Sequence, residues 1–167
     1  MMKSNRRRFL TKAPALAAAA TVAGASVLAG DHDEKKDGSE RKKKRRKAVK
    51  KAHYPGGTPD ETPLFTPVIT FGNMVFLSGI GAHFDGDVAA HTAHVLDKMK
   101  ENLESVGSSM EKVLKVNVYL NDLEDYKAMN DVFRGRFGTE PGVRTTIAAA
   151  GGIPGNSHVE IDCIAYV

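Results

Sequence analysis

Two charged residues near the end of the sequence have the chemistry of a binding or catalytic site. From Pro141 to Ser157 the only charged side chain is Arg144, in an apolar run rich in β-forming residues. A guanidinium buried there without a partner costs several kcal/mol. The next carboxylate is Glu160, in a second β-like run that we expect to form a neighbouring strand. The pair forms either an internal ion pair or a site in which Arg144 grips a ligand carboxylate and Glu160 orients a water.

The other residue types that carry chemistry form no recognisable motif. His83, His91 and His94 match no zinc-binding spacing, and we interpret them as surface or helix-end histidines rather than metal ligands. Cys163, the single cysteine, alternates with apolar residues, so we interpret it as a buried small hydrophobe rather than a nucleophile. The sequence has no nucleotide-binding glycine loop, Walker loop or GxSxG motif. It therefore predicts no metal and no organic cofactor.

Periodic patterns after residue 58 define the elements that must position Arg144 and Glu160. Apolar runs on either side of the turn dipeptide Gly72-Asn73 predict two paired strands within residues 67–79. Apolar steps of three and four predict a helix from residue 88 to Gly107. Further patterns predict a strand, a helix and two strands, over residues 114–120, 121–137, 143–149 and 158–166. The order ββαβαββ predicts an α+β sandwich with both helices on one face of the sheet.

The charges divide the chain into two unlike parts. Residues 1–57 contain 16 Lys and Arg against 5 Asp and Glu, a net charge of +11. Residues 58–167 contain 8 against 15, a net charge of −7, and are long enough for one domain with a hydrophobic core. Because this domain is acidic and has no basic face, specific binding of nucleic acid is not expected.

The N-terminal part resembles an export signal followed by a linker. A basic segment with Arg6-Arg7-Arg8 precedes an Ala-rich run over residues 13–29, too short and too weakly apolar for a firm membrane span. The pattern in residues 1–30 resembles a twin-arginine signal peptide cleaved near residues 25–30, and predicts a periplasmic or secreted protein; the alternative is an amphipathic N-terminal helix. Dense Lys and Arg in residues 31–57 predict a disordered polybasic linker, either solvated or in weak contact with an anionic envelope surface.

The order and spacing of several motifs resemble those of the RidA family, also called YjgF-like or L-PSP endoribonuclease-like proteins. The motifs are GNMVFLSG at 72–79, VLKVNVYLNDLEDYKAMNDVF at 113–133, a P-x-x-R-T-T run at 141–146 and VEIDCIAYV at 159–167. The resemblance covers essentially all of residues 60–167, within the domain predicted over residues 58–167. It implies the chorismate-mutase-like α+β fold, assembled as a homotrimer with sites in the clefts between subunits.

The same resemblance implies hydrolysis of 2-imino acids, or their enamine tautomers, to 2-oxo acids and ammonia. Arg144 matches the arginine that binds the substrate carboxylate, and Glu160 matches the glutamate that positions the attacking water. The residues that complete the cleft by this likeness are Phe65, Ser78, Asn130 and, through its backbone, Thr146. The alternative is a noncatalytic trimer of the cell envelope that binds small carboxylates or partner proteins, or acts as a chaperone. A nuclease function is the least favoured, because the domain is acidic.

Overall fold

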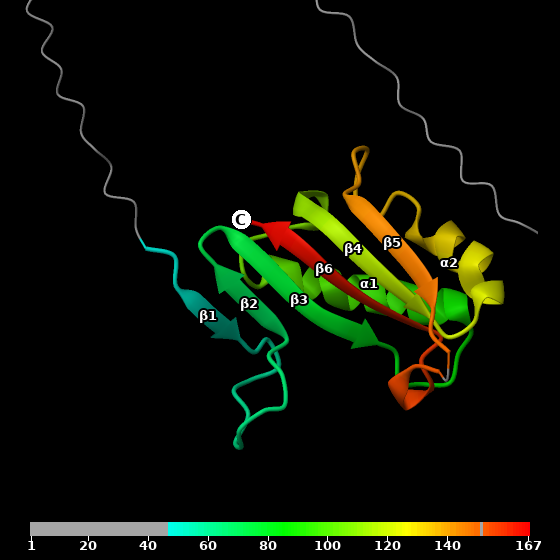
Figure 1. The fold of residues 1–167 in the computed structure, drawn as a ribbon, viewed down its shortest axis with the longest axis horizontal. Coiled ribbons are helices and arrows are strands. Elements are labelled where there is room, and N and C mark those ends of the chain that lie inside the picture. Colours follow the sequence, from blue (N-terminus) through cyan, green and yellow to red (C-terminus); the bar gives the residue numbers. More distant parts are fainter. Residues whose placement is uncertain (1–46, 151) are drawn as a thin grey trace, which may run out of the picture. The chain divides into compact units, whose positions relative to one another are not determined.

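The computed structural model describes residues 47–150 and 152–167. The predicted signal peptide at residues 1–30 and most of the predicted linker at residues 31–57 lie outside the described residues. The described part forms a six-stranded mixed sheet with two α-helices, α1 and α2 (Figure 1). The strands are β1 (Lys50–His53), β2 (Val68–Phe71), β3 (Met74–Gly81), β4 (Val113–Leu120), β5 (Val143–Ala148) and β6 (Val159–Tyr166). The helices are α1 (Val88–Glu104), α2 (Tyr126–Phe133) and three 3-10 turns, η1 (Met110–Lys112), η2 (Leu123–Asp125) and η3 (Pro154–Asn156).

The C-terminal strand β6 lies inside the sheet and not beside β5. The strand order is β1-β2-β3-β6-β4-β5, with β4 and β5 parallel and every other neighbouring pair antiparallel (Figure 1). Alternate residues of β6, among them Ile161 and Cys163, are buried in the core, which suits a strand that pairs on both sides. The prediction that the strands of Arg144 and Glu160 are neighbours is therefore wrong, because β4 separates them.

The sheet begins earlier in the chain than the sequence predicts. Strand β1 pairs antiparallel with β2, from Lys50 opposite Phe71 to His53 opposite Val68. The His53 imidazole also lies within hydrogen-bond distance of the Thr70 hydroxyl, at 2.8 Å. Residues 50–53 fall within the stretch predicted as a disordered linker, so that prediction is wrong for this segment. The Lys-rich composition suggested disorder, but it is also compatible with an edge strand, because an edge strand keeps its charged side chains in water.

The helices and the inner face of the sheet form the hydrophobic core. The predicted helix after residue 88 is confirmed as α1, whose start is capped by the Asp87 carboxylate accepting a hydrogen bond from the Ala90 N–H at 2.8 Å. Its buried stripe includes Val95 and Met99, which pack toward β3 and β6, and α2 packs against α1. This arrangement confirms an α+β fold with a mixed sheet and two helices.

The second helix is shorter than the pattern predicts. The sequence predicts a helix over residues 121–137, whereas the structure has the turn η2 followed by α2, which ends at Phe133. Gly135 follows with a φ of 79°, a conformation that favours glycine and ends the helix. Phe137 is nevertheless buried, and its ring lies 4.7 Å from that of Phe133, so the apolar pattern continues beyond the helix. No helix among the described residues has the length and apolar character needed to cross a membrane.

The other face of the sheet carries exposed apolar side chains. Phe76 of β3 alternates with the buried Val75 and Leu77, and 39% of its surface is exposed. Ile147 of β5 is 50% exposed. Apolar groups exposed on several strands of one face are typical of a surface that another protein covers.

Candidate functional site

Arg144 lies on the edge strand β5 and its guanidinium rests on aromatic side chains of α2. Its Nη2 donates a hydrogen bond to the Tyr126 hydroxyl at 3.4 Å, and its Cζ lies 4.8 Å from the centre of the Phe133 ring. A guanidinium above an aromatic face gains about 0.5–1 kcal/mol at an exposed site. These contacts orient the guanidinium without neutralising its charge, because neither partner is an anion.

A pocket of about 450 Å³ opens beside this guanidinium. Its lining contains no Asp or Glu; the residues are Tyr126, Asn130, Phe133, Arg134, Gly135, Phe137, Gly138, Pro141, Gly142 and Arg144. Among the described residues, no carboxylate lies within ion-pair distance of Arg144. The internal ion pair between Arg144 and Glu160, one of the two interpretations of the sequence, is therefore not formed within this chain. The pocket suits an anionic ligand with a small apolar part.

Glu160 lies on β6, opposite Tyr119 of β4 and Gly81 of β3. Its carboxylate crosses the backbone of Gly79, where a methyl group would come within 2.8 Å of the carboxylate carbon and closer still to Oε1. The pairing of β3 with β6 is irregular between Leu77 and Ile80, which places Gly79 at a bulge. Gly79 therefore leaves the space that the Glu160 side chain fills.

The two residues predicted to be catalytic lie on opposite faces of the sheet. Arg144 is registered with Val116, whose side chain is buried under the helices, so Arg144 points toward the helical face. Glu160 alternates with the buried Val159 and Ile161 and points toward the open face. A single chain therefore does not bring Arg144 and Glu160 into one site.

Two of the four remaining predicted site residues lie in these two places. Asn130 lines the pocket beside Arg144. Ser78 adjoins Gly79, and its N–H donates to the Pro67 carbonyl at 3.0 Å. Phe65 is exposed in the loop before β2, and Thr146 of β5 has a buried hydroxyl with no hydrogen-bond partner among the described residues; neither lines the pocket.

The sequence analysis missed Gly79, Tyr126 and Phe133 as parts of these two places. A glycine inside a strand is itself a signal, since it often marks a bulge or a close approach by another group. Tyr126 and Phe133 matched the apolar face of a helix, and nothing in that pattern separates a core aromatic from one that supports a guanidinium.

A polar cluster surrounds Glu160 on the open face. Asp162 accepts hydrogen bonds from the Asn117 amide at 2.8 Å and from the Tyr119 hydroxyl at 3.1 Å. Burial, the hydrogen bond to Asp162, and the charges of Asp162 and Glu160 raise the pKa of Tyr119 above its ordinary value. Tyr119 thus remains a neutral hydrogen-bond donor beside Glu160. On the core side of β6, burial raises the pKa of the Cys163 thiol to about 12, with a smaller contribution from Asp162, which suits a structural rather than a nucleophilic thiol.

The histidines differ in part from their interpretation as surface or helix-end residues. His91 lies in the first turn of α1, but only 1% of its surface is exposed. Both ring nitrogens are hydrogen-bonded to backbone groups, of Phe84 and His158. Within residues 47–150 and 152–167, no group of three or more His, Cys, Asp or Glu side chains is arranged to hold a metal ion.

Comparison with known proteins gives several relatives with similar sequences. The chain is 36% identical over 109 residues to the protein mmf2, mitochondrial, of Schizosaccharomyces pombe, covering 60% of this chain and 86% of the relative. It is 32% identical over 120 residues to the 3-aminoacrylate deaminase RutC of Acinetobacter baylyi, covering 68% and 94%. It is 30% identical over 110 residues to a 2-iminobutanoate/2-iminopropanoate deaminase of Dermatophagoides farinae, covering 62% and 85%.

The fold and the family model agree with these relatives. A crystal structure of a member of the YjgF protein family from Neisseria meningitidis matches with a TM-score of 0.58 and 29% identity, covering 64% of this chain and 89% of that one. The model of the family described as Endoribonuclease L-PSP matches residues 58–167, which is more than half of the chain. The chain therefore belongs to the endoribonuclease L-PSP family, the RidA family that its sequence motifs resemble.

Proposed function

We propose that this protein is a hydrolase that deaminates 2-imino acids, or their enamine tautomers, to 2-oxo acids and ammonia. The observation that carries the proposal is the Arg144 guanidinium, which lines a pocket and has no carboxylate partner among the described residues. A planar guanidinium binds a carboxylate through two parallel hydrogen bonds. Relatives named as 3-aminoacrylate and 2-iminobutanoate/2-iminopropanoate deaminases support the same reaction class.

The proposed reaction requires the protein to position the substrate and a water, and it requires no cofactor. Arg144 holds the substrate carboxylate, and Glu160 takes a proton from the water that attacks the imine carbon, giving a carbinolamine. The imine nitrogen takes up one proton from solvent as the water adds and a second proton from Glu160. The carbon–nitrogen bond then breaks, and ammonia leaves as the hydroxyl gives its proton to solvent and becomes a carbonyl. Phe65, Ser78, Asn130 and the Thr146 backbone are proposed to complete the cleft around these groups.

The site in this proposal is completed by a second copy of the chain, within a homotrimer. Arg144 and Glu160 lie on opposite faces of one sheet, with β4 between their strands, so they meet only if they come from different subunits. The exposed Phe76 and Ile147 of the open face support such an assembly, since they offer an apolar surface to a neighbour. Sedimentation of the purified protein should give the mass of a trimer.

We also propose that the protein is exported, with residues 1–30 as a twin-arginine signal and the Lys- and Arg-rich segment after them in weak contact with anionic envelope surfaces. Cell fractionation and N-terminal sequencing of the mature protein test this. Replacing Arg6 and Arg7 by Lys should retain the precursor in the cytoplasm.

A second candidate function is binding of small carboxylates without chemistry. It is favoured by the absence of any Asp or Glu among the residues that line the Arg144 pocket. Both functions need Arg144, and only deamination needs Glu160.

The decisive experiment generates 2-iminopropanoate and 2-iminobutanoate in situ with an amino-acid oxidase and follows imine loss. Deamination predicts that the unmodified protein accelerates the loss and that Arg144→Ala and Glu160→Gln each abolish the acceleration. If the unmodified protein gives no acceleration but binds 2-oxobutanoate through Arg144, the protein is a carboxylate-binding member of the family.

A further inference from the structure

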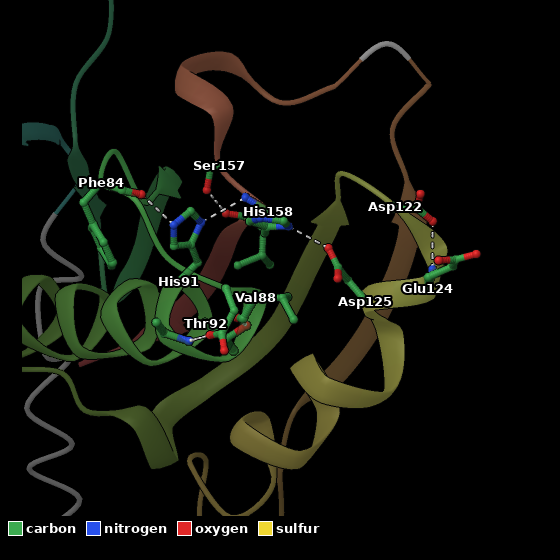
Figure 2. Close-up of polar contacts among 12 residues, drawn as sticks. Phe84, Val88, His91, Thr92, Asp122, Glu124, Asp125, Ser157 and His158 are labelled. Carbon is green, nitrogen blue, oxygen red and sulfur yellow. Dashed lines mark hydrogen bonds and ion pairs between the residues drawn. The ribbon is translucent and has the colours of Figure 1, made fainter.

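A buried histidine, His91 of α1, joins this helix to the loop at Phe84 and to the start of β6 (Figure 2). The Nδ1 atom of His91 lies 3.0 Å from the backbone nitrogen of His158, and its Nε2 atom lies 2.8 Å from the Phe84 carbonyl oxygen. Because the His158 N–H can only donate, Nδ1 accepts and the ring proton on Nε2 is donated to Phe84. The His91 ring is thus a neutral bridge with both nitrogens satisfied, which explains how it is buried.

His158, the residue that His91 holds, is fixed from two further sides. Its carbonyl accepts a hydrogen bond from the N–H of Asn121, directly after β4, at 2.9 Å. Its side-chain Nδ1 lies 2.9 Å from Oδ2 of Asp125, at the end of η2 (Figure 2). The start of β6 is therefore tied to α1, to the end of β4 and to the turn that leads into α2.

Asp125 contacts His158 from inside the continuous turn formed by η2 and α2. It has helical backbone angles, and its side chain makes no capping hydrogen bond. The cap of this turn is Asp122, which has an extended backbone and accepts a hydrogen bond from the Glu124 N–H at 2.9 Å (Figure 2). The Asp125 carboxylate is therefore not needed for capping, and its contact with His158 joins the start of α2 to the start of β6.

The two ends of this contact adjoin the two halves of the proposed site. Asp125 directly precedes Tyr126, which accepts a hydrogen bond from Arg144. His158 lies two residues before Glu160 on the way into β6. None of His91, His158 and Asp125 lines the Arg144 pocket, so they act on it through their neighbours.

We infer that the chain of contacts from His91 through His158 to Asp125, here called the histidine link, positions Arg144 and Glu160 for the reaction. His158 and Asp125 are positioning residues that keep the helix supporting the guanidinium in register with the strand that carries the glutamate. This inference rests on the proposed deaminase function for its kinetic effect, and on the contacts alone for its structural effect.

The test compares His158→Leu, His158→Asn and a control, Asp122→Ala, in the purified full-length protein. His158→Leu removes the bond to Asp125, whereas Asn retains an N–H near the position of Nδ1. Asp122→Ala removes a carboxylate from the same turn without touching His158. The readouts are kcat and KM for 2-iminobutanoate, and the NMR signals of the Arg144 Nε–H and the Glu160 amide.

The histidine link predicts that His158→Leu raises KM and lowers kcat, each by about tenfold, and shifts both NMR signals. His158→Asn should restore most of the activity, and Asp122→Ala should lower the melting temperature while KM and both signals stay unchanged. A purely structural role would reduce the amount of folded enzyme, and with it the apparent kcat, but would leave KM unchanged. An unchanged KM in folded His158→Leu, or an equal effect of Asp122→Ala, overturns the inference.

The two proposals fail in distinguishable ways. If the unmodified protein does not hydrolyse imines, the proposed function fails, and the NMR signals alone decide on the histidine link. The inference about the histidine link is then supported if His158→Leu shifts both NMR signals while Asp122→Ala shifts neither. Any other outcome contradicts it. Should His158→Leu not fold, Asp125→Ala provides the same comparison from the other end of the contact.

Discussion

Replacing Gly79 by alanine should displace Glu160 while leaving the fold intact. The new methyl group would stand 2.8 Å from the carboxylate carbon of Glu160 and 3.1 Å from its Cγ. Ordinary contacts of this kind begin near 3.4 Å, and Oε1 would lie closer to the methyl group than the carboxylate carbon does, so the end of the Glu160 side chain must move by about 1 Å to make room. Because this end is flexible and half-exposed, it can move without disturbing the backbone of β3 or β6.

Gly79→Ala should lower the catalytic rate strongly and change the free energy of unfolding only slightly. A misplacement of about 1 Å in a group that positions a reactant lowers the rate by up to about 100-fold, or roughly 3 kcal/mol in transition-state stabilisation. The free energy of unfolding should change by less than about 1 kcal/mol, since the sheet keeps its hydrogen bonds. The assay is the loss of 2-iminobutanoate generated by an amino-acid oxidase, together with urea unfolding of the same preparation.

Gly81→Ala is the matched control on the same strand. A methyl group at Gly81 would meet Ser157 Cβ at 3.4 Å and His83 Cε1 at 3.7 Å, both ordinary contacts. Gly81 also pairs with Glu160 across strands β3 and β6, but the Glu160 carboxylate is not among the nearest neighbours of a methyl group at Gly81. If Gly79→Ala retains full activity while Glu160→Gln is inactive, the position of Glu160 derived from this chain is wrong for the working enzyme. If the two glycine variants lose activity equally, the effect belongs to the strand and not to the carboxylate.

Three other predictions concern the guanidinium, the thiol and the first strand. Arg144→Lys keeps the charge but loses the planar, stacked, bidentate grip, so KM for the imino acid and Kd for 2-oxobutanoate should each rise about tenfold or more, measured by kinetics and calorimetry. Because the pKa of Cys163 is raised to about 12 in the folded protein, its thiolate fraction at pH 8 is about 10⁻⁴, and a thiol reagent should react only as fast as the protein unfolds. The unfolding free energy should also fall as the pH rises from about 9 toward 12, since only the unfolded thiol loses its proton there, and Cys163→Ala should remove that part of the fall; a slope unchanged by the substitution would contradict the burial argument. Deleting residues 1–57 removes β1 and the hydrogen bond between His53 and Thr70. The shortened protein should therefore be less stable in urea, by about 1 kcal/mol or more, than a protein lacking only residues 1–46. Equal stability of the two would show that β1 adds nothing to the sheet.

Patterns along the sequence were sufficient for elements whose contacts are local or repeat regularly. The helix α1 follows from apolar steps of three and four, because those residues share one face of a helix whatever it packs against. The isolation of Arg144 in an apolar run also followed from the sequence, and the structure places it at a pocket without a carboxylate partner among the described residues. The family was evident from the order and spacing of several motifs, and the family model matches residues 58–167.

Tertiary structure alone decided which residues face one another. Alternation in β5 and β6 predicts strands but contains no information on strand order or register. The position of β4 between β5 and β6 separates Arg144 from Glu160, and the register of β5 on β4 puts Arg144 on the helical face, opposite to Glu160. The burial of His91 depends on backbone partners 7 and 67 residues away, which no local pattern records. Strand β1 likewise exists because β2 offers it an edge to pair with. The sequence therefore determined the local elements and the residue types of the proposed site, while long-range pairing determined that Arg144 and Glu160 lie apart within one chain.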